Sequence, residues 1–383
     1  MAKYKLKELC EFITDGTHQT PEYCGNDGVI FLSSKDVTER KINWDSVKYI
    51  PNALHEKLCK RLKPRKNDIL LAKNGTTGVA AIVDRDEIFD VYVSLAVLRP
   101  LNVVYPKYLL YAINSPVVKR QFDAGLKGVG VPNLHLSVIK ETWINVVKKE
   151  GQQKVCKVLD KIEKIIELKK QELQLLDELI KARFVEMFGD PVSNSCGLPE
   201  ATLPELGEFG RGVSKHRPRN DPKLLDGEYP LIQTGDVANA DLYILTYNST
   251  YSELGLKQSK MWKKGTLCIT IAANIAKTAI LNFDACFPDS VVGFEANNRT
   301  NNIFIHYWFS FFQEILETQA PESAQKNINL KVLSELKVIV PGKKEQDKFT
   351  DFVNQVNKSK VAVQKSLDET QLLFDSLMQK YFG

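Results

Sequence analysis

The sequence predicts an α+β protein in which two globular α/β domains are joined to two long helices. We expect these helices to pair as an antiparallel coiled coil within one chain, which gives it an approximate two-fold axis. Three observations predict this fold. The 383-residue chain contains an internal duplication, each copy begins with short strand-like runs, and each copy ends with a long heptad-spaced segment free of Pro and Gly. A repeat of domain length indicates duplication of a whole unit, because solenoid periods are only about 20–50 residues.

The internal repeat rests on phrases that return in the same order. The matched phrases are residues 6–12 with 203–209, 29–37 with 229–237, 66–72 with 264–270, 132–136 with 326–330, and 187–189 with 381–383. The last two pairs share one offset of 194 residues, and chance would not keep that register over more than fifty residues. We therefore expect one globule in each copy, at residues 1–149 and 190–343.

Short apolar runs predict the strands of the first globule. Residues 29–32, 69–72 and 79–83 are such runs, and the polar cluster at 73–78 separates two of them. An amphipathic helix is expected to begin near Pro106, because Pro suits the first turn of a helix. The second globule is expected to repeat this order.

The two long segments, roughly residues 152–187 and 345–381, carry matching heptads. Spacings of four and three are typical of a coiled-coil seam rather than of the wider stripe on a globular surface helix. The apolar seam positions are Val155, Leu159, Ile162, Ile166, Leu173, Leu176, Ile180, Phe349, Val353, Val356, Val363, Leu367, Phe374 and Leu377. Because a globule stands before each helix, antiparallel pairing of segments 150–189 and 344–383 would place the globules at opposite ends of a rod. The heptads alone leave a homodimer zipper open as the alternative.

Composition restricts the class of protein. No run approaches the ~18 consecutive apolar residues of a membrane span, and the charged N-terminus does not resemble a signal peptide. Seven scattered cysteines without a Cys-x-x-Cys pair indicate reduced thiols in a cytoplasm, not a disulfide framework or a zinc site. Residues 1–149 hold 23 basic and 16 acidic side chains, which is compatible with a polyanionic partner.

The sequence carries no complete motif for catalysis or metal binding. We find no phosphate-binding loop, no dinucleotide fingerprint and no Asn/Asp-Pro-Pro-aromatic motif of an adenine methyltransferase. Asp289 and Glu295 begin the pattern of a metal-dependent nuclease, but no lysine or matching acid completes it. The five histidines show no metal spacing. We therefore expect no catalytic residue, no metal and no bound cofactor in this chain.

Four pairs of polar loops are the candidate DNA contacts, because their side chains offer donors and acceptors to base edges and phosphates. In the first globule the candidates are Thr17, His18, Gln19, Ser34, Lys35, Lys73, Asn74, Thr76 and Lys127. In the second globule they are Lys215, His216, Arg217, Arg219, Gln233, Thr234, Asn274, Lys277 and Lys326. A basic run at residues 57–66 is either a further phosphate contact or an exposed face. An ordinary solvated turn is the alternative for each loop.

This layout of two globules, each followed by a long helix, resembles the specificity subunits of type I restriction–modification enzymes. The local phrases that carry the resemblance are residues 15–18, 71–75, 187–189, 289–293, 323–330 and 345–346. The resemblance covers essentially the whole chain.

The resemblance implies two target-recognition domains, 1–149 and 190–343, each reading one half of a split double-stranded DNA site in the major groove. It implies that the paired helices set the unread spacer and dock two methyltransferase subunits. S-adenosylmethionine would bind to those subunits, whereas ATP and Mg would act on the restriction–translocase subunits. The chain itself would be a non-catalytic cytoplasmic protein. The sequence leaves two alternatives open: the specificity subunit of a type IIB-like enzyme, and a coiled-coil adaptor that binds no nucleic acid.

Overall fold

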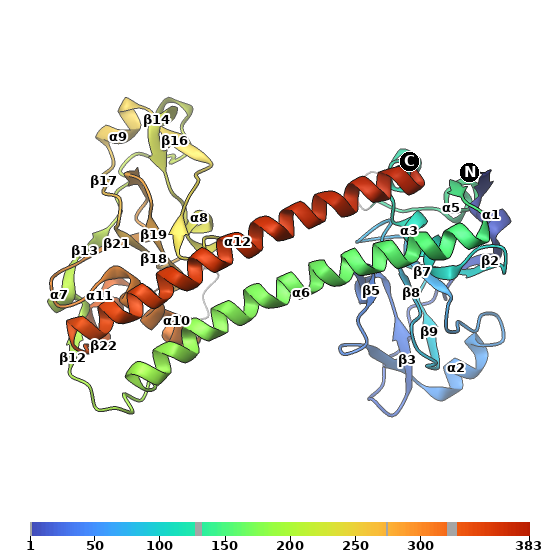
Figure 1. Cartoon of the computed structure of the whole chain (residues 1–383), viewed down its shortest axis with the longest axis horizontal. Coiled ribbons are helices and arrows are strands. Elements are labelled where there is room, and N and C mark those ends of the chain that lie inside the picture. Colours follow the sequence, from blue (N-terminus) through green and yellow to red (C-terminus); the bar gives the residue numbers. More distant parts are fainter. Residues whose placement is uncertain (1, 127–131, 273–274, 320–327) are drawn as a thin grey trace. The chain divides into compact units, whose positions relative to one another are not determined.

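The computed structural model describes residues 2–126, 132–272, 275–319 and 328–383 (Figure 1). Its contacts divide the chain into two compact units. The first unit contains residues 1–171 and 364–383, and the second contains residues 172–363. Each unit therefore combines one globular head with parts of both long helices. We call residues 2–148 the first head and residues 190–342 the second head.

The first head is built around a four-stranded antiparallel sheet in the order β2-β10-β7-β8. Its strands are β2 (Cys10–Asp15), β10 (Leu95–Pro100), β7 (Ile69–Ala72) and β8 (Ala80–Ile82). Strand β7 is buried along its whole length, which explains why its sequence is a continuous apolar run rather than an alternating one. The strand-like runs in the sequence are thus confirmed as β3, β7 and β8.

Smaller sheets and helices complete the first head. A three-stranded sheet, β6-β3-β9, contains β6 (Lys48–Ile50), β3 (Val29–Leu32) and β9 (Phe89–Val91), with β3 and β9 parallel. Two further pairs are β1 (Ala2–Lys5) with β11 (Trp143–Val146) and β4 (Val37–Thr38) with β5 (Lys41–Ile42). The helices are α1 (Leu6–Leu9), η1 (Ser34–Asp36), α2 (Asn52–Leu58), α3 (Pro106–Ile113), α4 (Pro116–Gly125) and α5 (Leu136–Glu141). Helix α3 begins at the proline that the sequence singled out.

The second head repeats this frame. Its main sheet has the order β13-β21-β18-β19-β15, in which the first four strands correspond to those of the first head. The strands are β13 (Gly207–Arg211), β21 (Val291–Ala296), β18 (Leu267–Thr270), β19 (Thr278–Leu281) and β15 (Tyr243–Ile244). A second sheet, β16-β14-β20-β17, is formed by β16 (Ser249–Tyr251), β14 (Leu225–Leu231), β20 (Ala285–Cys286) and β17 (Met261–Trp262). The duplication inferred from the sequence is therefore a duplication of topology.

One more strand pair of the second head has a counterpart in the first. Strand β12 (Glu200–Thr202) pairs with β22 (Lys337–Ile339), as β1 pairs with β11. The helices are α7 (Leu203–Leu206), η2 (Pro222–Leu224), α8 (Thr234–Ala238), α9 (Glu253–Lys257), α10 (Asn302–Gln319) and α11 (Leu330–Glu335).

The long helices are α6 (Lys149–Phe188) and α12 (Lys343–Phe382), each of 40 residues. They agree with the predicted segments 152–187 and 345–381 to within a few residues. A rise of about 1.5 Å per residue makes each helix about 60 Å long. No helix in the described ranges is both long and apolar enough to cross a membrane.

Within the first unit, the end of α12 packs beside the beginning of α6. The Asn145 side chain, just before α6, donates to the carbonyl oxygens of Phe382 (3.2 Å) and Gly383 (2.9 Å). About two to three helical turns before Phe382, Gln371 and Phe374 of α12 line the same cavity as Ile166 of α6. The residue numbers rise in opposite directions along the two helices, so their pairing here is antiparallel.

Within the second unit, the beginning of α12 packs beside the end of α6. The ring of Phe349 lies 5.3 Å from that of Phe184 and 5.8 Å from that of Phe188, measured between centroids. Farther along, Lys360 Nζ lies 2.5 Å from Asp177 Oδ1. This pairing is antiparallel as well, so the predicted intramolecular direction is confirmed in each unit.

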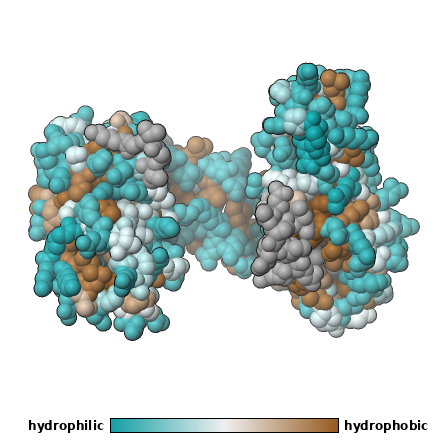
Figure 2. Space-filling view, turned by 180° about the vertical axis from the view of Figure 1, so that it is seen from behind, coloured by the Kyte–Doolittle hydropathy of each residue, from teal (hydrophilic) through white to brown (hydrophobic). Residues whose placement is uncertain are grey.

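The predicted seam is most deeply buried where a head covers the helices. Val155, Leu159 and Ile162 are buried in the first unit, and Ile180, Phe349, Val353 and Val356 in the second, whereas Leu173, Leu176, Val363 and Leu367 are half-buried. Phe184, Phe188, Met378 and Phe382 are also buried, which the heptad pattern did not predict. The apolar side chains of Ile165, Leu175 and Leu179 are exposed, and Figure 2 shows brown, hydrophobic surface among teal on the long helices.

Candidate nucleic-acid interface

Three polar segments of the first head meet at one place, although they are far apart in sequence. Thr76 Oγ1, in the loop between β7 and β8, donates to the carbonyl oxygens of Ser34 (3.3 Å) and Val37 (3.1 Å). The Ser34 amide in turn donates to Ser94 Oγ at 3.0 Å. These bonds gather the candidates Ser34, Lys35, Asn74 and Thr76 around η1, and Lys35 and Thr76 are exposed there.

The loop after β2 is fixed to the same place by an ion pair. Lys73 Nζ donates to Asp15 Oδ2 at 2.6 Å, and both side chains are buried. Burial alone would raise the pKa of Asp15, but the hydrogen bond from Lys73, with a contribution from His18, outweighs it and holds the pKa below its ordinary value. Because its ammonium is buried and paired, Lys73 positions this loop, and direct DNA contact by Lys73 is disfavoured.

The other candidates in this loop remain accessible. His18 and Gln19 are exposed, whereas Thr17 and Asn74 are half-buried. Arg61 Nη2 donates to the carbonyl oxygens of Asp15 (2.8 Å) and Gly16 (2.7 Å), which holds the loop against the basic run after α2. Lys57, Lys60 and Lys63 of that run are exposed and form no ion pair within the described part of the chain. The loop therefore has a basic rim.

In the second head, the equivalent region is an open polar cavity of about 320 Å³. Arg219, Gln233 and Thr234 line it together with Asn220, Ser249 and Ser290, which were not among the candidate contacts. Ser290 directly precedes β21 as Ser94 directly precedes β10, so the repeat could have indicated both serines. In the first head this serine bonds to η1, whereas in the second it faces the cavity.

Carboxylates orient the basic cluster beside this cavity. Asp289 lies 2.5 Å from Arg219 Nη2 and 3.7 Å from Arg217 Nη2. His216 Nε2 lies 3.2 Å from Asp221 Oδ2, and Lys215 is exposed. Lys277 is half-buried, and its backbone is bonded to Thr270. Arg219, Gln233 and Thr234 therefore line one cavity, with Arg217 held beside it by Asp289, whereas Lys277 belongs to the turn between β18 and β19.

Three candidates, Lys127, Asn274 and Lys326, lie outside the described residues. Within the described ranges, no group of three or more His, Cys, Asp or Glu side chains could hold a metal ion. What both heads do offer is a set of hydrogen-bond donors, acceptors and cations on loops held by a rigid sheet. That set can recognise the edges of bases and the phosphates of a nucleic acid.

Comparison with known proteins gives a consistent result. The sequence profile described as "Type I restriction modification DNA specificity domain" matches residues 1–178 and 200–370. A Methanocaldococcus jannaschii protein named as the MjaX specificity subunit of a type I restriction enzyme is 20% identical over 356 residues, which are 89% of this chain and 83% of that protein. The MjaVIII specificity subunit of the same organism is 25% identical over 183 residues, which are 46% of this chain and 43% of that protein.

Two solved structures share the fold. The S subunit of the type I restriction–modification system from M. genitalium has a TM-score of 0.55 at 16% identity, covering 100% of this chain and 96% of that one. A chain from a study of complex assembly and conformational transition of the type I R-M system has a TM-score of 0.60 at 17% identity, covering 99% and 97%.

Proposed function

The chain belongs to the family of type I restriction–modification DNA specificity subunits, and from this premise we propose that each head reads one half of a bipartite DNA site. Subunits of this family are non-catalytic and bind no cofactor themselves. The observation that carries the proposal is the duplicated frame with unlike loops. Equivalent sheets support a Lys73–Asp15 pair in the first head and an open cavity beside Arg219 in the second. Two heads that share one fold but differ in their loops recognise two different half-sites.

In the first head, we assign phosphate contact to the exposed lysines and base contact to the polar side chains of the loops. Lys35, Lys57, Lys60 and Lys63 neutralise phosphates, which supplies salt-dependent affinity without sequence choice. His18, Gln19, Asn74 and Thr76 stand at the centre of this basic rim and present donors and acceptors to base edges in the major groove.

In the second head, Arg219, Gln233 and Thr234 are the base-reading candidates. Asp289 fixes the Arg219 guanidinium from one side, so its remaining N–H donors point along a defined direction. An arginine held in this way suits bidentate contact with a guanine edge. Lys215 and Arg217 flank these residues and contact phosphates.

The long helices connect the heads, and we propose that their length sets the number of unread base pairs between the half-sites. Their exposed apolar side chains, among them Ile165, Leu175 and Leu179, dock two methyltransferase subunits, which carry S-adenosylmethionine. Restriction–translocase subunits, which use ATP and Mg, join that assembly in the cytoplasm.

A binding experiment tests the proposal. The chain is produced together with a methyltransferase subunit of the same genome, and the purified complex is titrated with fluorescent duplexes that contain or lack the recognised site, at several salt concentrations. We expect affinity for every duplex to fall with salt, and the site-containing duplex to bind at least about a thousandfold more tightly at physiological salt. A complex that binds both duplexes equally, or binds neither, contradicts the proposal.

A further inference from the structure

Each head touches the long helix that follows it through the same loop, the one after its second repeated phrase. The phrases end at Val37 and Val237, and Lys41 and Asp241 each stand four residues farther along, Lys41 at the start of β5 and Asp241 two residues before β15. A cation in one copy thus stands where the other copy has a carboxylate. The contacts of the two side chains show what this reversal does.

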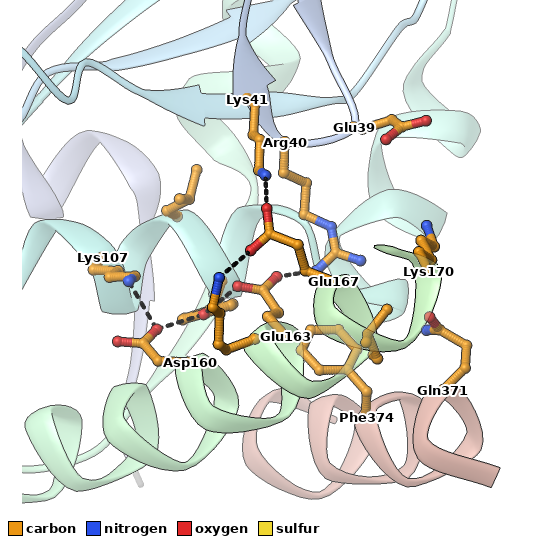
Figure 3. A pocket seen from close by; sticks show the side chains of 14 residues that line it. Glu39, Arg40, Lys41, Lys107, Asp160, Glu163, Glu167, Lys170, Gln371 and Phe374 are labelled. Carbon is orange, nitrogen blue, oxygen red and sulfur yellow. Dashed lines mark hydrogen bonds and ion pairs between the residues drawn. The ribbon is translucent and has the colours of Figure 1, made fainter. Parts of the chain in front are cut away.

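In the first unit, the head offers cations and the helix offers carboxylates (Figure 3). Lys41 Nζ lies 2.9 Å from Glu167 Oε1, and Arg40 Nη1 lies 3.0 Å from Glu163 Oε1. The Arg40 guanidinium also lies 4.8 Å from the ring centroid of Phe374 on α12. Arg40 and the preceding Glu39 have φ angles of 64° and 47°, a left-handed turn that costs energy in non-glycine residues. Both cations thus reach the helix from a strained turn.

The side of α6 that faces the head carries three carboxylates, Asp160, Glu163 and Glu167, together with Lys164, Ile166 and Lys170. Lys107 Nζ lies 2.9 Å from Asp160 Oδ1, and the Tyr111 hydroxyl lies 2.6 Å from an oxygen of Asp160 and 2.6 Å from one of Glu163, so it can donate to either. Figure 3 shows Lys107, Asp160 and Glu163 at a cavity of about 690 Å³ between the head and the two helices, which Tyr111 also lines. Three carboxylates of α6 therefore receive donors from the head.

In the second unit the charges are reversed. The carboxylate of Asp241 accepts from Lys360 Nζ on α12, and Asp177 of α6 accepts from the same ammonium at 2.5 Å. The Lys360 side chain is only 10% exposed. Burial alone would lower the pKa of Lys360, but its hydrogen bonds to the two carboxylates outweigh burial and raise it, so Lys360 is a cation. Here the head offers a carboxylate and the helix offers the cation.

The reversal extends to the rest of the helix surface. With the offset of 194 residues, Asp160, Glu163 and Glu167 correspond to Asn354, Asn357 and Val361, so α12 lacks all three carboxylates. Lys360 corresponds to Ile166, and Asp177 corresponds to Gln371. Tyr111 and Tyr307, by contrast, are both the sixth residue of α3 and α10, and each lies against the long helix that follows its head. The two units therefore share the position of docking but differ in its charge.

We propose that these opposite charges determine where each head docks, so that each head binds only at its own site on the paired helices. A head that carried Lys41 into the second unit would place its ammonium against Lys360. A head that carried Asp241 into the first unit would face Asp160, Glu163 and Glu167. Unpaired like charges at a partly buried contact are a strong penalty against the wrong partner. The inference goes beyond DNA reading, because it concerns which reader stands at which end of the spacer and needs no DNA.

The test uses hydrogen exchange of the full chain, followed in peptides that cover residues 172–181 and 354–363. Asp241→Lys gives the second head the side chain of the first, and we expect exchange in these peptides to become about tenfold faster or more, because a second ammonium then faces the largely buried Lys360. Lys360→Glu should do the same. The double variant, with both changes, restores one cation between two carboxylates and should return to within about twofold of the unchanged chain.

A matched control distinguishes charge-specific docking from an effect of net charge. Glu228 is exposed in the same head and forms no ion pair in the described part of the chain. Glu228→Lys makes the same change in charge as Asp241→Lys, so it should neither accelerate exchange nor rescue Lys360→Glu. Rescue by Glu228→Lys, or no rescue by Asp241→Lys, overturns the proposal of charge-specific docking.

A second background keeps the test decisive if Lys360→Glu does not fold. Lys360→Ile introduces the residue found at the equivalent position of α6, and the two carboxylates that lose their partner are more than half exposed to water, which limits the cost of leaving them unpaired. In that background no cation is left to repel a lysine on the head, and Asp177 remains to accept from it, so Asp241→Lys should not accelerate exchange. An equally large effect of Asp241→Lys in both backgrounds would mean that Asp241 has only a structural role, and the proposal would be wrong.

Discussion

Lys73 and Asp15 form a buried ion pair, with Nζ 2.6 Å from Oδ2, that joins the loop after β7 to the loop after β2. The two residues are separated by 58 positions in the sequence. Lys73 was a candidate DNA contact, but this geometry makes it a residue that positions the loop carrying Thr17, His18 and Gln19. The distinction between positioning and contact can be measured.

Lys73→Met should destabilise the first head by about 3 kcal/mol, because it leaves the Asp15 carboxylate buried without its partner. Lys73→Met combined with Asp15→Asn should recover most of that loss. Lys35→Ala, at an exposed position, should leave stability unchanged and weaken DNA binding through one lost phosphate contact. Chemical denaturation and binding titrations of the three variants check this, and an unchanged stability for Lys73→Met would refute the positioning role.

Arg219→Ala should weaken discrimination at the second half-site by about 1–3 kcal/mol and leave the first half-site intact. Lys215→Ala together with Arg217→Ala should also impair only the second half-site. Lys337→Ala, an exposed basic residue on β22 outside the loops, is the control and should change neither. Binding is measured on duplexes with one half-site altered at a time. Equal loss at both half-sites would mean that these residues act on the whole assembly.

Deleting residues 169–175 of α6 and 363–369 of α12 removes one heptad from each helix and preserves the seam. We expect the spacer to shorten by about three base pairs, because seven residues span about 10 Å and B-DNA rises about 3.4 Å per base pair. Both half-sites should stay the same. The methylated motif of the deleted variant reports both quantities, and an unchanged spacer would end the idea that the helices act as a ruler.

Acid should weaken the second unit through His306. Its Nδ1 lies 2.9 Å from Thr278 Oγ1. The pKa of His306 is lowered from 6.5 to about 4, mainly by burial; Asp241 opposes this shift and Lys360 adds to it. The unfolded chain therefore binds a proton more readily than the folded chain between those two pH values, so stability falls as pH falls through this window. We expect a loss on the order of 1 kcal/mol between pH 7 and pH 5.

His306→Gln removes the titrating group, so its free energy of unfolding should vary less over the same pH range. Denaturant unfolding at pH 7, 6 and 5 measures both slopes. Parallel slopes for the two proteins would show that other groups cause the acid sensitivity.

Much of this fold could be predicted because it follows from local sequence and from the periodic spacing of apolar residues. The repeated phrases fixed the duplication, and the heptads with a globule before each helix favoured the antiparallel pairing now seen in each unit. The heptads did not predict that Phe184 and Phe188 are buried. Where a head covers the helix, Ile180, Phe184 and Phe188 follow each other at spacings of four, and the narrow seam widens into the stripe of a globular helix.

The site was less predictable, because its bonds join residues far apart in the chain. Nothing in the sequence pairs Lys73 with Asp15 or brings Ser94 to Ser34. Lys360 lies on the heptad spacing of the seam, but no pattern in the sequence indicates that it bonds to carboxylates from α6 and from the second head. Charge composition could not reveal that Lys41 and Asp241 contact oppositely charged helix surfaces, since that requires the placement of both loops. Which side chains contact bases remains a prediction.

The most direct measurement is single-molecule methylome sequencing of a cell that expresses this gene with a partner methyltransferase gene, and of the same cell without this gene. We expect an adenine-methylated motif with two unlike halves and a fixed gap, present only when the gene is present. A methylome that does not change, while the methyltransferase is active, would contradict a role in DNA specificity.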